Sequence, residues 1–442
     1  MERLDELVLE LENLPDGYIS RKTIKGKVYS YLQYFHKGKI ISKYVPADKL
    51  ADLEAKLAQR KAIEQELKGL STGNIEMPPL TKREKELTGN VMFGDKVAAK
   101  LYKGEVVSVN KPIAPAFLRK SKDGKAFFAS RAIDTSRANA RDLLKALGIK
   151  ESNEAIIPLY VNGCCLTDNY WFRPSGAVTK YEELEFGNNL YAGAAYDGGK
   201  REYQVKPSRT PELTTSGHFE KCWRFEKDAW WLYKKESEDE IFSELFVTEL
   251  AHELEIRTIK YIRTDDGVKS RNFASKYNFE PMSGYIDNAD DIEGGFKALK
   301  PYGTEVLKDY IRLRYLDAIT YNLDRSLNDM GVMRNRTTGA VVGLAPNFDN
   351  NSCLTAVSPR LDIDPENDPI MTSFIKFLKS KREVRKLFKK CKFYKISKDI
   401  IKKIAIKANP DMKNQKGAAE ALADFINDRI EYIRKFKKVS VE

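Results

Sequence analysis

Near the N-terminus lies a stretch in which hydrophobic and polar positions alternate, as they do in half-buried β-strands. Within residues 17–43 the apolar positions are largely aromatic or β-branched. Gly26-Lys27 and Lys37-Gly38 supply turn residues between the runs. The alternation therefore predicts a ribbon of two or three antiparallel strands.

A helical period replaces the alternation in residues 47–69. Asp48 can cap the start of a helix there, and Gly69 can end it. The apolar positions that recur near helical spacing are Leu50, Leu53, Leu57, Ile63 and Leu67. Such a Glu/Lys-rich helix is either a coiled-coil arm for self-association or a spacer packed on its neighbours, and the sequence leaves both open.

The next part of the chain carries weaker patterns and no recognisable chemistry. Two β-like runs are broken by Gly94-Asp95 and Lys103-Gly104. A helix is then expected to start at Thr135 or Ser136 and to end at Gly148. We expect this part to form a mixed sheet and helix that extends the domain following it.

Net charge adds a second feature to the picture. The 442 residues include 76 Lys+Arg and 64 Asp+Glu, a formal net charge of +12. The excess lies in residues 17–43, with seven basic residues and no acid, and in residues 376–407, with fourteen basic residues and two acids. Each stretch is either a solvated surface or a site for nucleic acid or another acidic partner. In the ribbon, the aromatic residues that could stack on bases are Tyr29, Tyr31, Tyr34 and Phe35.

The second basic stretch predicts C-terminal helices. Their apolar positions, expected to point inward with the lysines outward, are Phe374, Leu378, Leu387 and Phe388. Between the N-terminal helix and the rest, residues 71–90 have the Ser/Thr/Gly/Pro content of a linker.

Composition excludes several classes of protein. Hydrophobic residues make up 42% and aromatic residues 11%, too much for a disordered chain. Mean hydropathy is −0.51 and no apolar run approaches the ~18 residues of a membrane span. The start, MERLDELVLELENL, lacks the pattern of a signal peptide, so we expect a cytoplasmic protein without membrane contact. Five scattered cysteines and three histidines support neither a disulfide framework nor a zinc site.

The common short motifs of catalysis are missing. No Walker loop, GxGxxG or GxSxG is present. His252-Glu253 begins the zinc-protease pattern HExxH, but Ile256 occupies the position of its second histidine. A different set of segments follows in a fixed order, namely LTTSGHFEK at 213–221, WWLYKK at 230–235, IFSELFVTEL at 241–250, YNLDRSLND at 321–329 and LAPNFDNN at 344–351.

Phosphoryl transfer needs such an inventory. A loop must cover the triphosphate, and a strand lysine, held by a helix glutamate, must meet its oxygens. One Asp must orient the acceptor hydroxyl, and two further Asp or Asn side chains must hold magnesium. About 90 residues separate Lys234 from Asp324 and 25 separate Asp324 from Asp349.

With these segments the sequence resembles the HipA-like Ser/Thr protein kinases. The motifs that carry the resemblance are TTSGHFEKCW, WLYKK, FSEL, YNFEPM, NLDRSLNDMGVM and LAPNFDNNSCL; they lie within residues 205–360, and residues 80–200 match more loosely. The resemblance implies an α+β, two-lobed protein-kinase-like fold that binds ATP and Mg²⁺ between its lobes and phosphorylates Ser or Thr. It also implies a toxin, defence or growth-control role.

The sequence patterns and the resemblance together divide the chain into five parts. They are an N-terminal ribbon and helix (1–70), a linker (71–90), an extension of the N-lobe (91–200), the kinase N-lobe with ATP loop and hinge (201–285) and a helical C-lobe (286–442). The resemblance leaves the protein substrate open, and it implies an antitoxin or regulator as a partner. Nucleic acid is a second candidate partner, through residues 17–43 and 376–407.

The same resemblance assigns roles to single residues. Lys234, Glu244 and Asp324 become the phosphate-binding lysine, its helix partner and the residue that orients the acceptor hydroxyl. The residues assigned to ATP are Thr214, Thr215, Ser216, Gly217, Lys221, Lys234, Glu280 and Met282, of which the last two lie in the hinge that meets adenine. The metal ligands are Asp349 together with Asp329 or Asn328. Autophosphorylation is expected at Thr214, with Thr215 and Ser216 as neighbouring candidates.

Two positions depart from the family pattern N-x-D-R-H-x-x-N. Ser326 replaces the histidine, and Asp329 replaces the last asparagine, while Asn328 stands one place early. Asp can hold magnesium as well as Asn, but its extra charge opposes the triphosphate. A catalytically weak pseudokinase that binds nucleic acid or protein is therefore the alternative to an active kinase.

Overall fold

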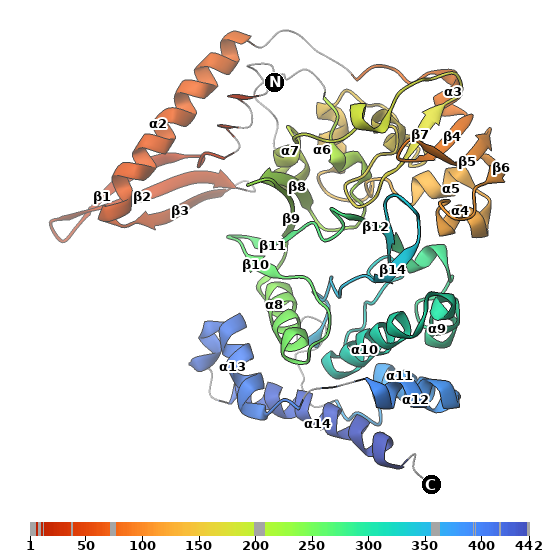
Figure 1. Ribbon diagram of the computed structural model, residues 1–442. Coiled ribbons are helices and arrows are strands. Elements are labelled where there is room, and N and C mark those ends of the chain that lie inside the picture. Colours follow the sequence, from red (N-terminus) through yellow and green to blue (C-terminus); the bar gives the residue numbers. More distant parts are fainter. Residues whose placement is uncertain are drawn as a thin grey trace.

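The chain is an α+β protein of small antiparallel sheets and helices (Figure 1). The computed structural model describes residues 6–7, 10–11, 13–36, 39–70, 77–198, 208–354, 363–391, 393, 395–414 and 417–439. Within them lie four sheets of three or four strands, with the C-terminal helices gathered at one end and the N-terminal ribbon standing to one side. The predicted α+β class is confirmed.

The N-terminal ribbon has three antiparallel strands: β1 (Tyr18–Ile24), β2 (Lys27–His36) and β3 (Lys39–Val45). Lys25 and Gly26 form the first turn with φ of 50° and 77°. Two left-handed residues give a turn whose twist matches that of the strands, so the first reversal is tight. The predicted ribbon is confirmed; its other turn, Lys37-Gly38, lies outside the described residues.

Helix α2 (Ala47–Leu70) follows the ribbon and matches the predicted helix. Its last turns pack into a core shared with residues 133–222, and the buried N-terminal members of that core are Leu7, Leu11, Ile63 and Leu67. Arg60 donates hydrogen bonds to the carbonyls of Leu11 and Leu14 at 3.1 and 3.0 Å. Of the two alternatives for this helix, the packed spacer is therefore the one that the structure supports.

A short helix and a strand occupy part of the predicted linker. Thr81 caps α3 (Lys82–Lys85) by accepting from the Glu84 amide, and the Glu84 carboxylate accepts from the Thr81 amide at 2.7 Å. Leu87 is fully buried. The linker prediction is therefore wrong for the end of the segment, while residues 71–76 lie outside the described part.

The second sheet has the order β6-β5-β4-β7, with strands β4 (Gly89–Phe93), β5 (Lys96–Tyr102), β6 (Glu105–Val109) and β7 (Tyr170–Pro174). Three of these strands form where two β-like runs were predicted. Lys103 and Gly104, with φ of 51° and 89°, reverse the chain and add β6.

Short helices connect this sheet to the next one: α4 (Ala116–Ser121), α5 (Gly124–Ala129), α6 (Ala140–Ala146) and α7 (Ala192–Asp197). Helix α6 starts later than predicted. The Asp134 carboxylate accepts from both the amide and the hydroxyl of Ser136, and this local turn delays the helix. Gly148, with φ of 66°, follows the helix as expected.

The third sheet lies at the centre of the molecule with the order β10-β11-β9-β8. Its strands are β8 (Lys221–Glu226), β9 (Ala229–Lys235), β10 (Tyr261–Arg263) and β11 (Gly267–Arg271). Helix α8 (Glu238–Glu253) follows β9 and begins with a capping box between Ser237 and Glu240. The predicted lysine strand and glutamate helix are both confirmed.

The last sheet and the helical end share the largest core. The sheet order is β12-β13-β14, with strands β12 (Tyr277–Pro281), β13 (Gly331–Asn335) and β14 (Val341–Leu344). The helices are α9 (Ile292–Leu299), α10 (Thr304–Thr320), α11 (Pro369–Ser380), α12 (Arg382–Lys390), α13 (Lys398–Ala408) and α14 (Ala418–Val439). The four apolar positions predicted to point inward from residues 374–388 are all buried.

The predicted hinge strand β12 pairs with β13 of the C-terminal part, so that strand belongs to the same sheet as the segments around the predicted metal ligands. The division into five parts otherwise stays a prediction. No helix among the described residues is both long and apolar enough to cross a bilayer.

Candidate active site

Lys234 is the centre of a buried cluster of charges. Its ammonium nitrogen lies 2.9 Å from Glu244 Oε1, 2.8 Å from Asp349 Oδ1 and 2.8 Å from Glu236 Oε1. Only 3% of Lys234 is exposed. Strand β9 therefore brings its lysine to the glutamate of helix α8 and to the Asp that follows β14, the three groups that the sequence placed together.

Glu244 links two parts of this cluster. It is fully buried on α8, and its second oxygen accepts from the backbone amide of Asn350 at 2.8 Å. One carboxylate thus holds the Lys234 side chain and the loop that carries Asp349. A helix glutamate with both oxygens engaged fixes the lysine in position with little freedom.

Asp349 and Asp329 are two carboxylates with opposite pKa shifts. Burial raises the pKa of Asp349, but the ammonium groups of Lys234 and Lys221 outweigh burial and hold that pKa well below its usual range. Burial, and then the negative charge of Asp349, raise the pKa of Asp329 to about 6. The amide of Ser326 donates to Asp329 at 3.1 Å. Asp349 is therefore ionised, and Asp329 titrates near neutrality.

These two carboxylates suit magnesium that also binds phosphate. Within the described ranges, no group of three or more His, Cys, Asp or Glu side chains could hold a metal ion by itself. Mg²⁺ commonly takes one or two carboxylates and completes its coordination with phosphate oxygens and water. The two carboxylates of Asp329 and Asp349 fit that kind of site. Since a nearby cation favours the ionised form of a carboxyl group, a bound Mg²⁺ would lower the raised pKa of Asp329.

Arg325 ties the loop after α10 to the loop after β14, and the sequence analysis missed it. Its guanidinium donates to Asp317 at 2.9 Å, to Asn347 at 2.9 Å and to Asn350 at 3.0 Å. It also donates to the Phe348 carbonyl at 2.7 Å. The signal was present in the N-x-D-R pattern and in the asparagines that flank Asp349, but sequence spacing gives no partner for either.

The loop before β8 approaches the same cluster through Gly217 and Lys221. Gly217 has a φ of 106°, and a side-chain carbon there would lie 2.3 Å from Lys221 Nζ. The φ of 106° lies in the left-handed region that favours glycine, so glycine suits this position in the loop next to Lys221. Lys221 is 8% exposed, and its pKa is lowered by burial against the opposing charge of Asp349. No hydrogen bond or ion pair joins its ammonium group to another described residue.

The three hydroxyls of this loop differ in access. Thr214 donates to the Cys164 carbonyl at 2.7 Å, and Thr215 donates to the Pro211 carbonyl at 2.8 Å; both threonines are buried. Ser216 is exposed. Thr214, the residue that the resemblance proposes for autophosphorylation, is therefore closed in this conformation because its hydroxyl is already engaged. Ser216 is the accessible candidate.

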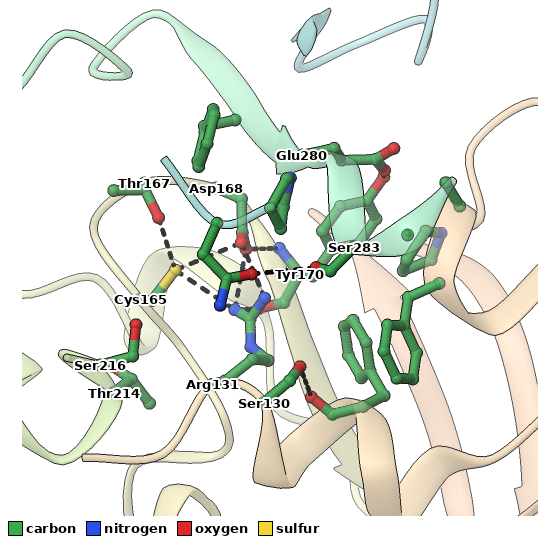
Figure 2. A pocket seen from close by; sticks show the side chains of 18 residues that line it. Ser130, Arg131, Cys165, Thr167, Asp168, Tyr170, Thr214, Ser216, Glu280 and Ser283 are labelled. Carbon is green, nitrogen blue, oxygen red and sulfur yellow. Dashed lines mark hydrogen bonds and ion pairs between the residues drawn. The ribbon is translucent and has the colours of Figure 1, made fainter. Parts of the chain in front are cut away.

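A cavity of about 130 Å³ lies between this loop and the hinge strand (Figure 2). Thr214 and Ser216 line it from the loop, and Glu280 and Ser283 line it from β12 and the turn after it. Its remaining wall comes from residues 115–131 and 165–170, in the part of the chain that was expected to carry no chemistry. These residues therefore help to close the cavity, and the expectation that they carry no chemistry stays a prediction.

Two ion pairs lie in opposite walls of this cavity. Arg131 donates to Asp168 at 2.7 and 2.9 Å across one side, with Cys165 beside them (Figure 2). On the hinge side Glu280 accepts from Tyr170 at 2.8 Å and pairs with Arg334 at 2.5 Å. Burial raises the pKa of the Cys165 thiol, so this thiol is not a reactive thiolate.

The second hinge residue assigned to ATP does not reach the cavity. Met282 is fully buried in the largest core, its amide donates to the Met330 carbonyl at 2.9 Å, and its carbonyl accepts from Tyr285 at 2.8 Å. Side chain and backbone are thus both engaged elsewhere. Glu280, by contrast, lines the cavity, although Arg334 and two tyrosines hold its carboxylate.

Asp324 and Asn328 lie at the open edge of the site. Asp324 is exposed; its amide donates to the Asn322 side chain at 3.2 Å, and its carboxylate accepts from Ser352 at 3.4 Å. Asn328 accepts from the Ser283 hydroxyl at 3.0 Å and lines the cavity. Of the two candidates for the second metal ligand, Asp329 is the one whose charge interacts with Asp349.

Comparisons with known proteins find one family model that matches the N-terminus and two solved structures that are similar to the chain. Residues 1–55 match a family described as a domain of unknown function (DUF6788). None of the curated protein sequences is significantly similar to this chain.

The proinflammatory kinase CtkA of Helicobacter pylori shares 16% identity over 47% of this chain and 89% of its own, with a TM-score of 0.36. HipA of Shewanella oneidensis MR-1, in a toxin–antitoxin complex with HipB and operator DNA, gives 11% identity over 79% of this chain and 99% of its own, with a TM-score of 0.49.

Proposed function

We propose that this protein is a HipA-like Ser/Thr protein kinase that transfers the γ-phosphate of ATP to a protein hydroxyl. The observation that carries the proposal is the buried contact of Lys234 with Glu244 of α8 and with Asp349. A strand lysine held by a helix glutamate beside a metal-binding Asp is the arrangement that positions a nucleotide triphosphate for transfer.

The two lysines would bind the phosphates. Lys221 is a buried cation with no hydrogen bond or ion pair to another described residue, and Gly217 lies in the loop beside it. A phosphate oxygen would supply the acceptor that this ammonium group lacks. Lys234 would exchange part of its contact with Asp349 for an oxygen of the same nucleotide, while Glu244 keeps it oriented.

Asp349 and Asp329 would hold the magnesium that accompanies ATP. When bound, Mg²⁺ would neutralise charge on the phosphate oxygens and so favour their transfer. The pair would also determine where the nucleotide stops in the cleft, because both carboxylates belong to loops that Arg325 holds together. The adenine base would enter the cavity beside Glu280 and Ser283.

Asp324 would orient the acceptor hydroxyl. Its carboxylate is exposed and makes one long hydrogen bond, with Ser352 at 3.4 Å, so a substrate hydroxyl can reach it. An acceptor oxygen bound there would donate its proton toward the carboxylate as it attacks the γ-phosphate. The protein substrate, an antitoxin or regulator, and a toxin, defence or growth-control role belong to this proposal as the resemblance implies them.

The test is the intact mass of the purified protein after incubation with ATP and Mg²⁺. We expect a gain of about 80 Da, the mass of one phosphoryl group, in the wild type and none in Asp324→Ala. Peptide mapping should place the group on Ser216 while Thr214 and Thr215 stay unmodified. A protein that neither gains mass nor binds ATP by calorimetry would contradict the proposal and leave the alternative of a pseudokinase binding module.

A further inference from the structure

The N-terminal ribbon has two unlike faces. Side chains of cross-strand partners point to the same face of a sheet, so the strand register assigns each residue of the ribbon to one of the two faces. One face meets helix α2, where Arg21 pairs with Glu54 at 2.5 Å and Ser30 and Val45 are buried. The other, here called the open face, carries Tyr18, Ser20, Lys22, Ile24, Lys27, Tyr29, Tyr31, Gln33, Ile40, Ser42 and Tyr44.

Tyrosines form a continuous strip on the open face. The Tyr44 ring lies 5.9 Å from the Tyr31 ring and 6.2 Å from the Tyr29 ring. Tyr18 and Tyr44 are 57% and 56% exposed. Tyr29 and Tyr31 are half-buried beside them. The strip therefore presents aromatic rings to solvent, where a ligand can reach them.

Positive charge accompanies the strip. Lys22 lies over the Tyr31 ring at 5.2 Å, Lys27 is exposed on the neighbouring strand, and no ion pair joins either to a described residue. The basic helices of residues 376–407 differ, since the rings of Phe377 and Phe388 are buried there, and Lys398, Lys402 and Lys407 pair with Asp424, Glu420 and Glu249. Of the two basic stretches, the ribbon is the one that combines aromatic rings with unpaired charge.

We propose that the open face of the ribbon binds single-stranded nucleic acid, with Tyr18, Tyr29, Tyr31 and Tyr44 stacking on unpaired bases. Lys22 and Lys27 would meet the phosphates between them. Stacking on rings needs the faces of the bases, which a duplex hides, whereas a strand without pairing presents them. The proposal assigns a ligand class to the matched domain of unknown function and does not depend on kinase activity.

The experiment measures binding of the full-length protein to a labelled strand of about 20 nucleotides by fluorescence anisotropy. RNA, DNA and the duplex of the same sequence are compared over a salt series. We expect single-stranded RNA, single-stranded DNA or both to bind more tightly than the duplex. The affinity should fall by about 0.7 log unit per log unit of salt concentration for each phosphate contacted. The preferred sugar identifies the natural ligand.

Two pairs of variants separate stacking from charge. Tyr44→Ala should weaken single-strand binding by about fivefold or more, while Tyr102→Ala, an equally exposed tyrosine on β5, leaves it unchanged. Lys22→Gln with Lys27→Gln should lower the salt slope by about 1.4. The control is Lys49→Gln with Lys61→Gln, two exposed positions on α2. It makes the same change in net charge and should leave the salt slope unchanged.

Three outcomes would overturn the proposal. One is no binding of any strand at about 50 mM salt. Another is a duplex affinity equal to the single-strand affinity, together with equal affinities of Tyr44→Ala and the wild type. That result would indicate that the ribbon lies in a groove of the duplex. The third is equal loss in Tyr44→Ala and Tyr102→Ala. Unchanged thermal unfolding of each variant checks that a lost signal is not lost folding.

Discussion

The Lys234 ammonium nitrogen lies 2.8 Å from Asp349 Oδ1, across a sequence separation of 115 residues. The contact joins the central sheet to the loop after β14 and leaves Asp349 only partly covered, since 29% of its side chain is exposed. A buried lysine with several carboxylates around it keeps the cluster near neutrality. A metal ion arriving with nucleotide would therefore replace an existing positive partner of Asp349.

Asp349→Ala should abolish the magnesium dependence of ATP binding. The variant removes one of two carboxylates available to the metal, and Lys234 keeps Glu244 as a partner, so the fold should persist. We expect affinity for ATP with Mg²⁺ to fall at least about tenfold, to the level measured with EDTA. Calorimetry with and without Mg²⁺ makes the comparison.

Asp324→Ala is the matched control, because that exposed carboxylate belongs to the acceptor side and not to the nucleotide. It should bind ATP as the wild type does and lose turnover. Unchanged nucleotide affinity in Asp349→Ala would rule out its role in metal binding.

Much of this site could be predicted because its residues lie in separable local patterns. The ordered segments placed Lys234 on an aromatic strand and Glu244 on the helix that follows it, and the structure confirms both elements. Glu236 follows directly after the end of β9 at Lys235, so the strand period does not determine which way its side chain points. Sequence alone offered no reason to prefer its contact with Lys234 over a solvated glutamate.

The cavity and the access of hydroxyls could not be predicted. The wall from residues 115–131 meets the hinge only through folding, so no local spacing indicates it. Thr214 and Ser216 are neighbours of similar chemistry in the sequence, yet the carbonyl of Cys164, fifty residues earlier, engages the first and leaves the second exposed. Contacts of this length depend on packing rather than on pattern.

Arg325→Gln should destabilise the protein. The change removes a buried guanidinium and leaves the Asp317 carboxylate, 3% exposed, with a hydrogen bond from the Asn322 side chain at 3.1 Å and a longer contact with Arg314 at 3.5 Å. Removing one partner of a buried pair costs about 3 kcal/mol or more of unfolding free energy. Denaturant unfolding followed by tryptophan fluorescence measures it.

Arg263→Gln serves as the control for that loss. Arg263 pairs with Glu238 at 2.8 Å on the surface, with 39% and 78% of the two side chains exposed. Its loss should cost less than about 1 kcal/mol. Equal effects of the two substitutions would mean that Arg325 does not hold the two loops together.

Metal-dependent nucleotide binding should strengthen as pH rises through about 6. Asp329, whose pKa is about 6, is protonated below that value and a poor ligand, and it is ionised above it. Asp329→Asn removes this titration while keeping an oxygen ligand. Because the terminal phosphate of ATP titrates in the same range, the measured quantity is the difference between wild type and variant from about pH 5 to 7.5. A difference that stays constant with pH would contradict the assignment.

Glu236 offers a test in the folding reaction itself. It is buried beside Lys234, and burial raises its pKa to about 8 although Lys234 opposes the shift. In the unfolded chain the same carboxyl takes its ordinary value of 4.5. Between these two values the unfolded chain releases a proton that the folded chain keeps, so this group makes stability fall as pH rises from about 5 to about 8.

Glu236→Gln carries no such proton and should therefore gain stability relative to the wild type across that window, reaching on the order of a few kcal/mol near pH 8 and levelling off above it. Near pH 5 the two proteins should unfold at the same denaturant concentration, because Glu236 is neutral in both states there. Glu253→Gln, exposed on the same helix that holds Glu244, should show no growing difference. If the wild type instead becomes more stable than the Glu236→Gln variant as pH rises, the carboxylate at 236 is ionised in the folded protein, and Lys234 has three charged partners rather than two.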